Sequence, residues 1–230
     1  MDMGQVYTIA GNSIYPVMAI LALWGAWCAV LVYRRVGRMQ FRSEDEQAEF
    51  LGLLEEPLLQ HDFNTITEAC EDDPRALSQL VLLATANRDV GFSKVRQLMM
   101  ERFQQDVLAD LEHRLAWVNT VIKSAPMLGL LGTVLGMMGA FGKLAAAENV
   151  KPEQLAGDIM LALITTACGL VIAIPLILVL TVINVRIRKL EDLITLGMTR
   201  FLEMFRTAMA SWEEKRAQQA APPKEMAASR

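Results

Sequence analysis

The amino-acid sequence predicts an all-α membrane protein with three transmembrane helices, of which helices 2 and 3 extend into a cytoplasmic helical bundle. Hydrophobic residues make up 53% of the 230 residues, and the mean hydropathy is +0.29, which is too apolar for an ordinary soluble domain of this size. Three stretches are free of charged residues over the roughly 20 positions that a helix needs to cross a bilayer core. Flanking apolar residues recur every three or four positions, the period of an α-helix.

The first charge-free stretch predicts a transmembrane helix at residues 14–33, preceded by a periplasmic N-terminus at residues 1–13. It lies between Asp2 and Arg34, and it lacks the basic n-region and small-residue cleavage site of a signal peptide, so we expect it to be retained. Basic residues follow this stretch and none precedes it. By the positive-inside rule, the N-terminus is therefore expected outside the cytoplasm.

Residues 34–123 are expected to form a cytoplasmic helical domain. Between Ser43 and Pro74 the chain has eleven acidic residues and no Lys or Arg, interleaved with apolar clusters. This pattern is typical of solvated helix faces on a small bundle, and its negative charge disfavours nucleic acid as a partner. From Lys94 onward one face is apolar at helical spacing, which predicts a long helix that runs directly into the membrane.

The second and third transmembrane helices are predicted at residues 124–146 and 158–185, joined by a short periplasmic loop at residues 147–157. Basic residues lie before the second span and after the third, which again indicates cytoplasmic ends. An apolar stripe after the third span predicts a cytoplasmic helix at residues 186–216. The polar tail at residues 217–230 has too little apolar content to fold and is predicted to be disordered.

No recognisable catalytic, metal or cofactor motif appears in the sequence. The cysteines at positions 28, 70 and 168 are too far apart in sequence to suggest a disulfide framework or a metal site. There is no Ser/His/Asp set or phosphate-binding loop, and the glycines of the second span do not follow the GxGxxG pattern. We therefore expect neither an enzyme nor a protein with a bound cofactor.

Small residues occupy one side of the second and third predicted spans. Helices in a membrane associate through close packing, which small residues permit because the backbones can approach each other. These stripes predict helices that pack tightly together or line a narrow passage. Their members are Gly129, Gly132, Thr133, Gly136 and Gly139 in the second span, and Ala162, Thr166 and Gly169 in the third, with Thr165 beside them.

The residues alone leave two interpretations of the threonines open. Each hydroxyl can bond to a carbonyl of its own helix, as is common for threonine in membrane helices. Alternatively, several copies of the chain can contribute the hydroxyls to a polar ring in an otherwise dry channel.

The run "SAPMLGLLGTVLGMMGAF", followed by "LALITTACGLVIAIPL", resembles the paired signature of the MotA/TolQ/ExbB proton-channel family, in particular its three-span ExbB and TolQ members. The resemblance covers Ser124 to Pro175 and extends over most of the chain through the order and topology of the spans. It implies a homopentamer whose second and third spans line a pore. That pore would hold the single membrane helices of a dimeric ExbD- or TolR-like partner, with Thr133 and Thr166 facing an aspartate on them.

The resemblance also implies a function in the bacterial inner membrane, with the N-terminus periplasmic and the C-terminus cytoplasmic. Protons, or alternatively sodium ions, would drive work at the outer membrane. An ExbB-type chain would serve transport through a TonB-like protein, whereas a TolQ-type chain would serve envelope integrity and cell division through a TolA-like protein. A non-conducting oligomeric scaffold is the rival from another class.

The third span departs from the family pattern at one position. ExbB and TolQ proteins usually carry a glutamate five residues before Thr166, where this chain has Leu161. Asp158, on about the same helical face, is a candidate for the proton pathway, and capping the helix N-terminus is its alternative role. Pro126 and Pro175 remove backbone hydrogen bonds and predict helix kinks. Lys143 is expected to extend its ammonium to the outer membrane surface.

Overall fold

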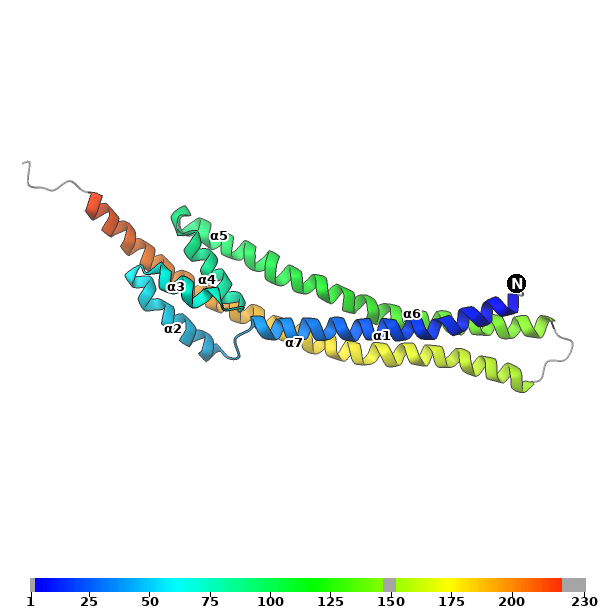
Figure 1. Cartoon of the computed structure of the whole chain (residues 1–230). Coiled ribbons are helices and arrows are strands. Elements are labelled where there is room, and N and C mark those ends of the chain that lie inside the picture. The colour runs from blue at the N-terminus through cyan, green and yellow to red at the C-terminus, as the bar shows by residue number, and fades with distance from the viewer. Residues whose placement is uncertain (1–2, 147–151, 221–230) are drawn as a thin grey trace, which may run out of the picture. The chain divides into compact units, whose positions relative to one another are not determined.

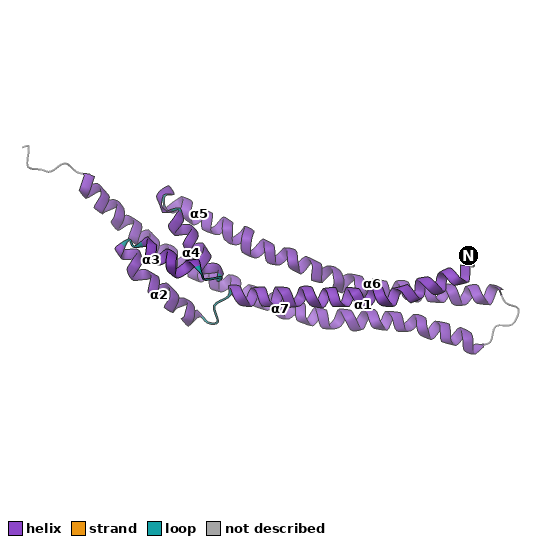
Figure 2. Cartoon of the chain, in the orientation of Figure 1, coloured by secondary structure: helices purple, strands orange, loops and turns teal. Residues whose placement is uncertain are grey.

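The computed structural model describes residues 3–146 and 152–220, and these residues form helices without any β-strand (Figures 1 and 2). The predicted all-α fold is thus confirmed. Five residues of the predicted periplasmic loop, 147–151, and ten of the predicted disordered tail, 221–230, lie outside the described residues. The elements are α1 (Met3–Met39), α2 (Glu44–Gln60), α3 (Phe63–Glu71), α4 (Ala76–Ala86), the 3-10 helix η1 (Arg88–Val90), α5 (Phe92–Arg102), the π-helix η2 (Phe103–Leu108), α6 (Ala109–Ala146) and α7 (Pro152–Ala220).

Three helical stretches are long and apolar enough to cross a membrane, as the sequence predicts. They are Ser13–Met39 in α1, Phe92–Ala145 from α5 to α6, and Pro152–Trp212 in α7. The long helix expected from Lys94 onward is present, but a turn of π-helix, η2, interrupts its α-helical hydrogen bonding. Pro126 and Pro175 lie inside α6 and α7.

The described residues fall into two compact units, which are treated separately below. We call residues up to 35 together with 111–186 the span unit, and residues 36–110 together with those from 187 onward the bundle unit. Helices α1, α6 and α7 contribute residues to the span unit. Helices α2 to α5, with η2 and the last part of α7, make up most of the bundle unit.

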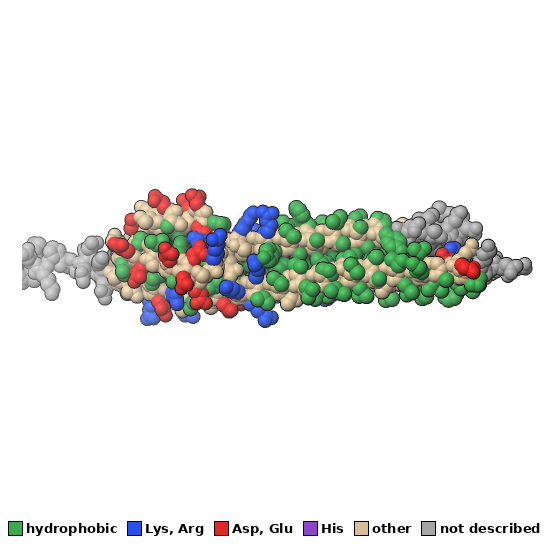
Figure 3. Space-filling view, turned by 90° about the horizontal axis from the view of Figure 1, so that it is seen from below, with side chains coloured by type: hydrophobic (Ala, Val, Ile, Leu, Met, Phe, Trp, Pro, Cys, Tyr) green, Lys and Arg blue, Asp and Glu red, His purple; other side chains and the backbone are tan. Residues whose placement is uncertain are grey.

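The span unit exposes large apolar side chains over much of its surface. Leu23, Met127 and Val171 are each at least 70% exposed, although they lie in the middle of long helices. Hydrophobic side chains likewise cover much of the face of the span unit that Figure 3 shows. A soluble protein rarely exposes so much contiguous apolar surface, so this surface suits contact with lipid or with other membrane helices.

The bundle unit has a core of its own. Phe201 and Phe205 of α7 are fully buried with ring centroids 5.7 Å apart, and they pack in a core that includes Leu54 of α2, Ile66 of α3 and Leu77 of α4. Close packing of α4 on α7 depends on Gly197, because a β-carbon there would come within 2.7 Å of a Leu77 methyl carbon. The acidic residues of the predicted solvated faces lie on the surface of this unit in Figure 3.

Candidate functional site

The glycines of the second predicted span lie against the third span of the same chain. A β-carbon added at Gly129 would come within 2.7 Å of the carbonyl oxygen of Thr165, and one added at Gly136 within 2.6 Å of the β-carbon of Ala162. From the other side, a β-carbon at Gly169 would lie 2.6 Å from the carbonyl oxygen of Ala125. These are closer approaches than real β-carbons make, so the glycines allow α6 and α7 to pack at backbone contact.

Gly132 extends this contact to the threonines. A β-carbon on Gly132 would lie 2.5 Å from the hydroxyl oxygen of Thr165, so the bare backbone of α6 leaves the space that this side chain fills. Gly139, two turns further along α6, is partly exposed. Gly129, Gly132 and Gly136 of α6 therefore pack against α7 of the same chain.

Three threonine hydroxyls meet where α6 crosses α7, and we call Thr133, Thr165 and Thr166 the threonine cluster. The hydroxyls of Thr133 and Thr166 share a hydrogen bond. The carbonyl oxygen of Gly129 lies within hydrogen-bond distance of all three hydroxyls, at 3.2 Å from Thr133, 3.0 Å from Thr165 and 3.1 Å from Thr166. Because two of these contacts cross from α7 to α6, the cluster joins the two helices.

Two threonine contacts are those of the first interpretation, in which each hydroxyl bonds to a carbonyl of its own helix, and the others cross between the helices. Thr133 reaches the carbonyl of Gly129 on its own helix, and Thr165 donates to Ala162 on its own helix at 2.6 Å. However, Thr133 also lies 3.2 Å from the carbonyl oxygen of Ala162 across the contact. A hydroxyl has one proton and two lone pairs, so the cluster contains more acceptors than protons.

Exposure divides the threonine cluster into an inner and an outer part. Thr165 is buried, with 4% of its surface exposed, whereas Thr133 and Thr166 are partly exposed. Large exposed apolar residues lie next to the outer pair along the two helices, among them Leu130, Val134 and Leu163. The cluster is therefore an uncharged polar spot on an apolar surface, and it can both donate and accept hydrogen bonds.

Asp158 does not cap the third helix, so that interpretation is wrong. Helix α7 begins at Pro152, which places Asp158 in its second turn. Its carboxylate pairs with Lys143 near the end of α6, with the ammonium nitrogen 2.7 Å and 3.1 Å from the two carboxylate oxygens. Asp158 lies eight residues before Thr166, or about 12 Å along the helix, so the structure does not bring it into the threonine cluster.

The position of the missing family glutamate lies on the surface. Leu161 is 58% exposed, and its carbonyl oxygen accepts a hydrogen bond of 3.4 Å from the hydroxyl of Tyr15 in α1. No cluster of three His, Cys, Asp or Glu residues capable of holding a metal ion occurs among the residues that the structure describes. The free cysteines, Cys28, Cys70 and Cys168, lie on different helices.

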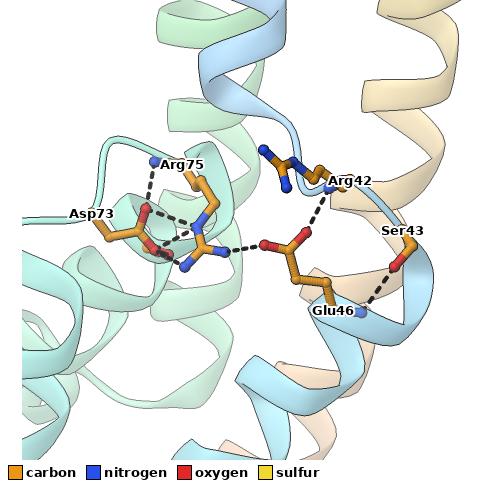
Figure 4. A network of polar contacts seen from close by, with 6 residues as sticks. Arg42, Ser43, Glu46, Asp73 and Arg75 are labelled. Atoms are coloured by element: carbon orange, nitrogen blue, oxygen red, sulfur yellow. Dashed lines mark hydrogen bonds and ion pairs between the residues drawn. The ribbon is translucent and has the colours of Figure 1, made fainter.

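A polar network in the bundle unit escaped the sequence analysis (Figure 4). Arg75 donates to the carboxylate of Asp73 at 2.7 Å and to that of Glu46 at 3.2 Å, and its guanidinium carbon lies 4.0 Å from the centre of the Phe41 ring. Glu46 in turn accepts a hydrogen bond of 2.8 Å from the backbone N–H of Arg42. The network ties the start of α2 to the turn before α4 and has a structural role.

The ionisation of Asp73 follows from this network. Burial by itself raises the pKa of the carboxyl, but hydrogen bonds from Arg75 and Ser78 outweigh that effect, and the pKa falls below its ordinary value. The Ser78 hydroxyl donates at 2.6 Å. Part of the network could have been found in the sequence, because Ser43 and Glu46 have the spacing of a helix capping box, and the Ser43 hydroxyl does accept from the N–H of Glu46.

Comparison with known proteins identifies relatives of the part of the chain that holds the threonine cluster. The model of a family described as the MotA/TolQ/ExbB proton channel family matches residues 74–195. The chain is 40% identical over 85 residues to the ExbB-like 2 protein of Helicobacter pylori and 34% identical over 102 residues to the Tol-Pal system protein TolQ of Haemophilus influenzae. It is 43% identical over 65 residues to the biopolymer transport protein ExbB of Xanthomonas campestris.

These matches cover parts of both chains. They span 37%, 44% and 28% of this chain and 55%, 43% and 26% of the three relatives, in the same order. The chain thus spans about half, or less, of the length of the relatives that it matches.

Proposed function

The chain belongs to the MotA/TolQ/ExbB proton channel family, and on this premise we propose that it is a proton-channel subunit of the bacterial inner membrane. In this proposal an ExbB/TolQ-type complex uses the proton motive force, with an ExbD/TolR-like partner, to energise outer-membrane transport through a TonB-like protein. The observation that carries the proposal is the threonine cluster, an uncharged polar spot at the contact of two membrane helices.

The free-energy cost of burying a charge favours uncharged hydroxyl groups at the contact between two membrane helices. A charged aspartate at the centre of a bilayer costs at least about 2.5 kcal/mol on insertion scales, so a carboxylate on a partner helix needs protonation or a polar neighbour there. A proton that crosses 100 mV releases about 2.3 kcal/mol, which is a comparable quantity. Thr133 and Thr166 can therefore lower the barrier for the partner's carboxyl group without binding it as tightly as a fixed charge would.

The assembly that fits this function is a homopentamer in which α6 and α7 surround a pore that holds the partner's helices. The N-terminus would lie in the periplasm and the C-terminus in the cytoplasm, because Arg34 and Arg186 follow the apolar parts of α1 and α7. Within each subunit, Gly129, Gly132, Gly136 and Gly169 would hold the wall of the pore together. Asp158, paired with Lys143, would lie at the periplasmic end and is proposed as the point where protons enter.

Valine substitution of the outer threonines tests the function. Thr133→Val with Thr166→Val keeps the side-chain shape but removes both partly exposed hydroxyls, so gradient-driven transport should fall at least about tenfold, the rate equivalent of a typical hydrogen bond of ~1.4 kcal/mol. The assay is uptake of an outer-membrane substrate in cells that lack the native protein. The assembled complex is quantified in parallel by native gel electrophoresis.

Thr181→Val is the matched control for this pair. Thr181 also lies in α7 and bonds to a carbonyl of its own helix, that of Ile177 at 2.9 Å, but it is exposed and lies outside the cluster. This variant should transport normally. If the double variant assembles and transports as well as Thr181→Val does, the threonine cluster takes no part in transport and the channel proposal fails.

A TolQ-type role in envelope integrity and cell division is the second candidate. It is favoured by the match to TolQ of H. influenzae, which extends over more of this chain than the two ExbB-type matches above. Deleting the gene separates the candidates. Loss of substrate uptake with an intact envelope supports the ExbB-type role, and detergent sensitivity with chaining cells supports the TolQ-type role.

A further inference from the structure

An apolar groove of about 460 Å³ lies between α1 and α6 within the span unit. Its volume falls within the range of roughly 300–1,000 Å³ that is usual for sites of small molecules. The hydroxyl of Thr120 in its lining already donates to the carbonyl of Ala116 at 2.9 Å, so it leaves the groove apolar. Residues that line the groove are Val17, Ile20 and Trp24 of α1, and Trp117, Thr120 and Val121 of α6.

Contacts among the three helices fix the direction of the groove. A β-carbon added at Gly25 of α1 would come within 2.7 Å of Val121 and 3.0 Å of Leu176 of α7, so these three residues lie at one level. Further along the chain, the guanidinium carbon of Arg186 in α7 lies 4.2 Å from the centre of the Tyr33 ring in α1. Helices α1 and α7 therefore run in the same direction.

The groove is roughly 18 Å long. Helix α6 runs antiparallel to α1 and α7, because the glycine contacts between α6 and α7 follow opposite orders along the two helices. At a rise of about 1.5 Å per residue, Val17 lies roughly 12 Å from the level of Gly25 on one side, and Trp117 lies roughly 6 Å from it on the other. Trp24 and Trp117 are exposed whereas Val121 is buried, so the indoles form rims of the groove and Val121 forms part of its floor.

These dimensions suit a single hydrocarbon chain. Over a length of roughly 18 Å, the volume of about 460 Å³ corresponds to a cross-section of roughly 26 Å², or a width of about 6 Å. A hydrocarbon chain is about 4–5 Å wide, because carbon atoms of neighbouring chains approach to about 3.5–4.0 Å. An α-helix with its side chains is about 10–12 Å wide, so a helix of a second copy could lie over the groove but could not fill it.

Charged residues follow the groove closely at one end only. On the helix faces that form the groove, the first charged residues beyond Trp117 are Arg114 of α6 and Arg35 of α1, roughly 5 and 9 Å further along. Beyond Val17, the nearest charged residue that the structure describes is Asp158 of α7, whose level is roughly 15 Å away. A phospholipid has the same distribution, with a charged headgroup at one end of its apolar chains.

The distance from the basic residues to the far end of the groove matches one leaflet of a bilayer. The level of Arg114 lies roughly 22 Å from that of Val17, and half of a bilayer with its headgroups is about 20–22 Å thick. Lys123 is exposed on the adjacent face of α6, and its amine can extend toward the same end. Basic residues at this end favour a lipid with net negative charge.

We propose that the groove binds one acyl chain of an anionic phospholipid, with the phosphate of this lipid near Arg35 and Arg114. The indoles of Trp24 and Trp117 would hold the chain from both helices, and the lipid would thereby join α1 to α6. This proposal requires that the chain lies in a membrane but not that it conducts protons. It therefore goes beyond the proposed function and does not depend on it.

Phosphatidylglycerol with brominated acyl chains tests the site in the full chain, because bromine quenches the fluorescence of a tryptophan that it contacts. The purified protein in detergent is titrated with this lipid. Quenching should saturate at a single lipid for each chain. Most of this quenching should be lost in the Trp24→Phe, Trp117→Phe variant, which keeps aromatic rings on both sides of the groove.

Val171→Trp, made in that double variant, is the control outside the groove. Val171 lies on α7, is 70% exposed and does not line the groove. Its level lies between those of Val17 and Gly25, so it samples the same depth. The new indole should stay unquenched at the lipid ratio that saturates the groove. If it is quenched as strongly as Trp24 and Trp117 are, lipid covers the apolar surface without a preferred site, and the proposal is overturned.

Brominated phosphatidylcholine, which has no net charge, tests the headgroup. It should need at least about tenfold more lipid for the same quenching, because the basic residues attract the additional negative charge. Arg35→Gln should reduce this preference and Arg35→Lys should keep it. Equal binding of the two lipids would overturn the proposal. Absence of saturable quenching by either lipid would also overturn it and would favour a second copy that covers the groove. None of these measurements involves transport, so their failure leaves the proposed function untouched.

Discussion

The best-defined interactions of single side chains in this molecule surround Asp73. Its side chain is 11% exposed and takes hydrogen bonds from Arg75 and Ser78. Hydrogen bonds to charged groups contribute about 1.5–3 kcal/mol each, more than bonds between neutral groups. A residue in the turn between α3 and α4 thus stabilises the whole bundle unit.

This network predicts how the stability of the bundle unit depends on pH. The pKa of Asp73 is lowered on folding, so its contribution is fully present above the ordinary pKa of aspartate and is lost as the pH falls through the lower folded-state pKa. Asp73→Asn should lower the free energy of unfolding near pH 7 by about 1–3 kcal/mol and flatten its decline in acid. Urea unfolding followed by circular dichroism, from pH 7 to pH 3, measures both effects.

Asp72→Asn is the control for this prediction. Asp72 is the adjacent carboxylate, but it is exposed and belongs to no part of the network. The substitution should change the free energy of unfolding by less than about 0.5 kcal/mol. Equal losses of unfolding free energy in the two variants would show that the loss of any negative charge in this turn, and not of the Arg75 network, sets the acid sensitivity.

Single positions also show where reasoning from sequence stops. Glu46 and Arg75 are 29 residues apart, and no spacing rule pairs two charges at that distance in an acidic domain. The Ser43 and Glu46 capping pair, by contrast, was readable from the sequence. Asp158 was placed near a helix start by its position before an apolar run, but the helix begins six residues earlier and the carboxylate pairs with Lys143. A run of apolar residues marks where lipid begins, not where a helix begins.

At the scale of helices, the stripe of small residues could be recognised in advance but its neighbour could not. Spacing of three and four residues places Gly129, Gly132 and Gly136 on one side of a helix. It cannot say whether another helix of the same chain or a separate partner covers that side. The structure shows that α7 of the same chain lies there. Similarly, the apolar period predicted a long helix into the second span but not the π-helical turn at residues 103–108.

Adding a methyl group at this contact tests how much the close packing matters. Gly169→Ala brings a β-carbon to 2.6 Å from the carbonyl oxygen of Ala125, and backbone cannot move aside as a flexible side chain can. The substitution should force α6 and α7 apart and cost about 1–3 kcal/mol. The melting temperature of the purified chain in detergent should fall accordingly.

Gly157→Ala is its counterpart on the same helix. A β-carbon at Gly157 would meet no atom within 4 Å, so this variant should be as stable as the unchanged chain or more stable by about 0.5–1 kcal/mol, since alanine favours a helix. Similar melting temperatures for Gly169→Ala and Gly157→Ala would mean that the contact between α6 and α7 is not tight in the membrane protein.

At the scale of the whole molecule, the composition predicted a membrane protein with three spans, and the helices agree. What the sequence could not supply was the register of the three helices. Counting charge-free positions starts the second span after Lys123, whereas the contacts of Gly25 place Val121, two residues earlier in α6, level with residues inside the other two predicted spans. Register is a property of how helices lie against each other, and a single segment does not contain it.

The proposed assembly makes a prediction about mass. The purified chain should form a homopentamer of about five times 25.6 kDa and should capture a single-span ExbD/TolR-like partner as a dimer, because α6 and α7 leave large apolar surfaces that one subunit does not cover. Native mass spectrometry from detergent micelles measures both. The Thr133→Val, Thr166→Val variant should give the same masses, and a stable monomer or dimer of the unchanged chain would contradict the pentamer.

The shared hydrogen bonds of the threonine cluster bear on the residence time of a carboxyl group that binds there. When nothing else is bound, the hydroxyls of Thr133 and Thr166 already satisfy each other and the carbonyl of Gly129. If the proposed partner brings a carboxyl group here, that group would exchange one set of hydrogen bonds for another and gain little enthalpy. Its residence time should then be short, and the helix that carries it could move past the cluster with little resistance.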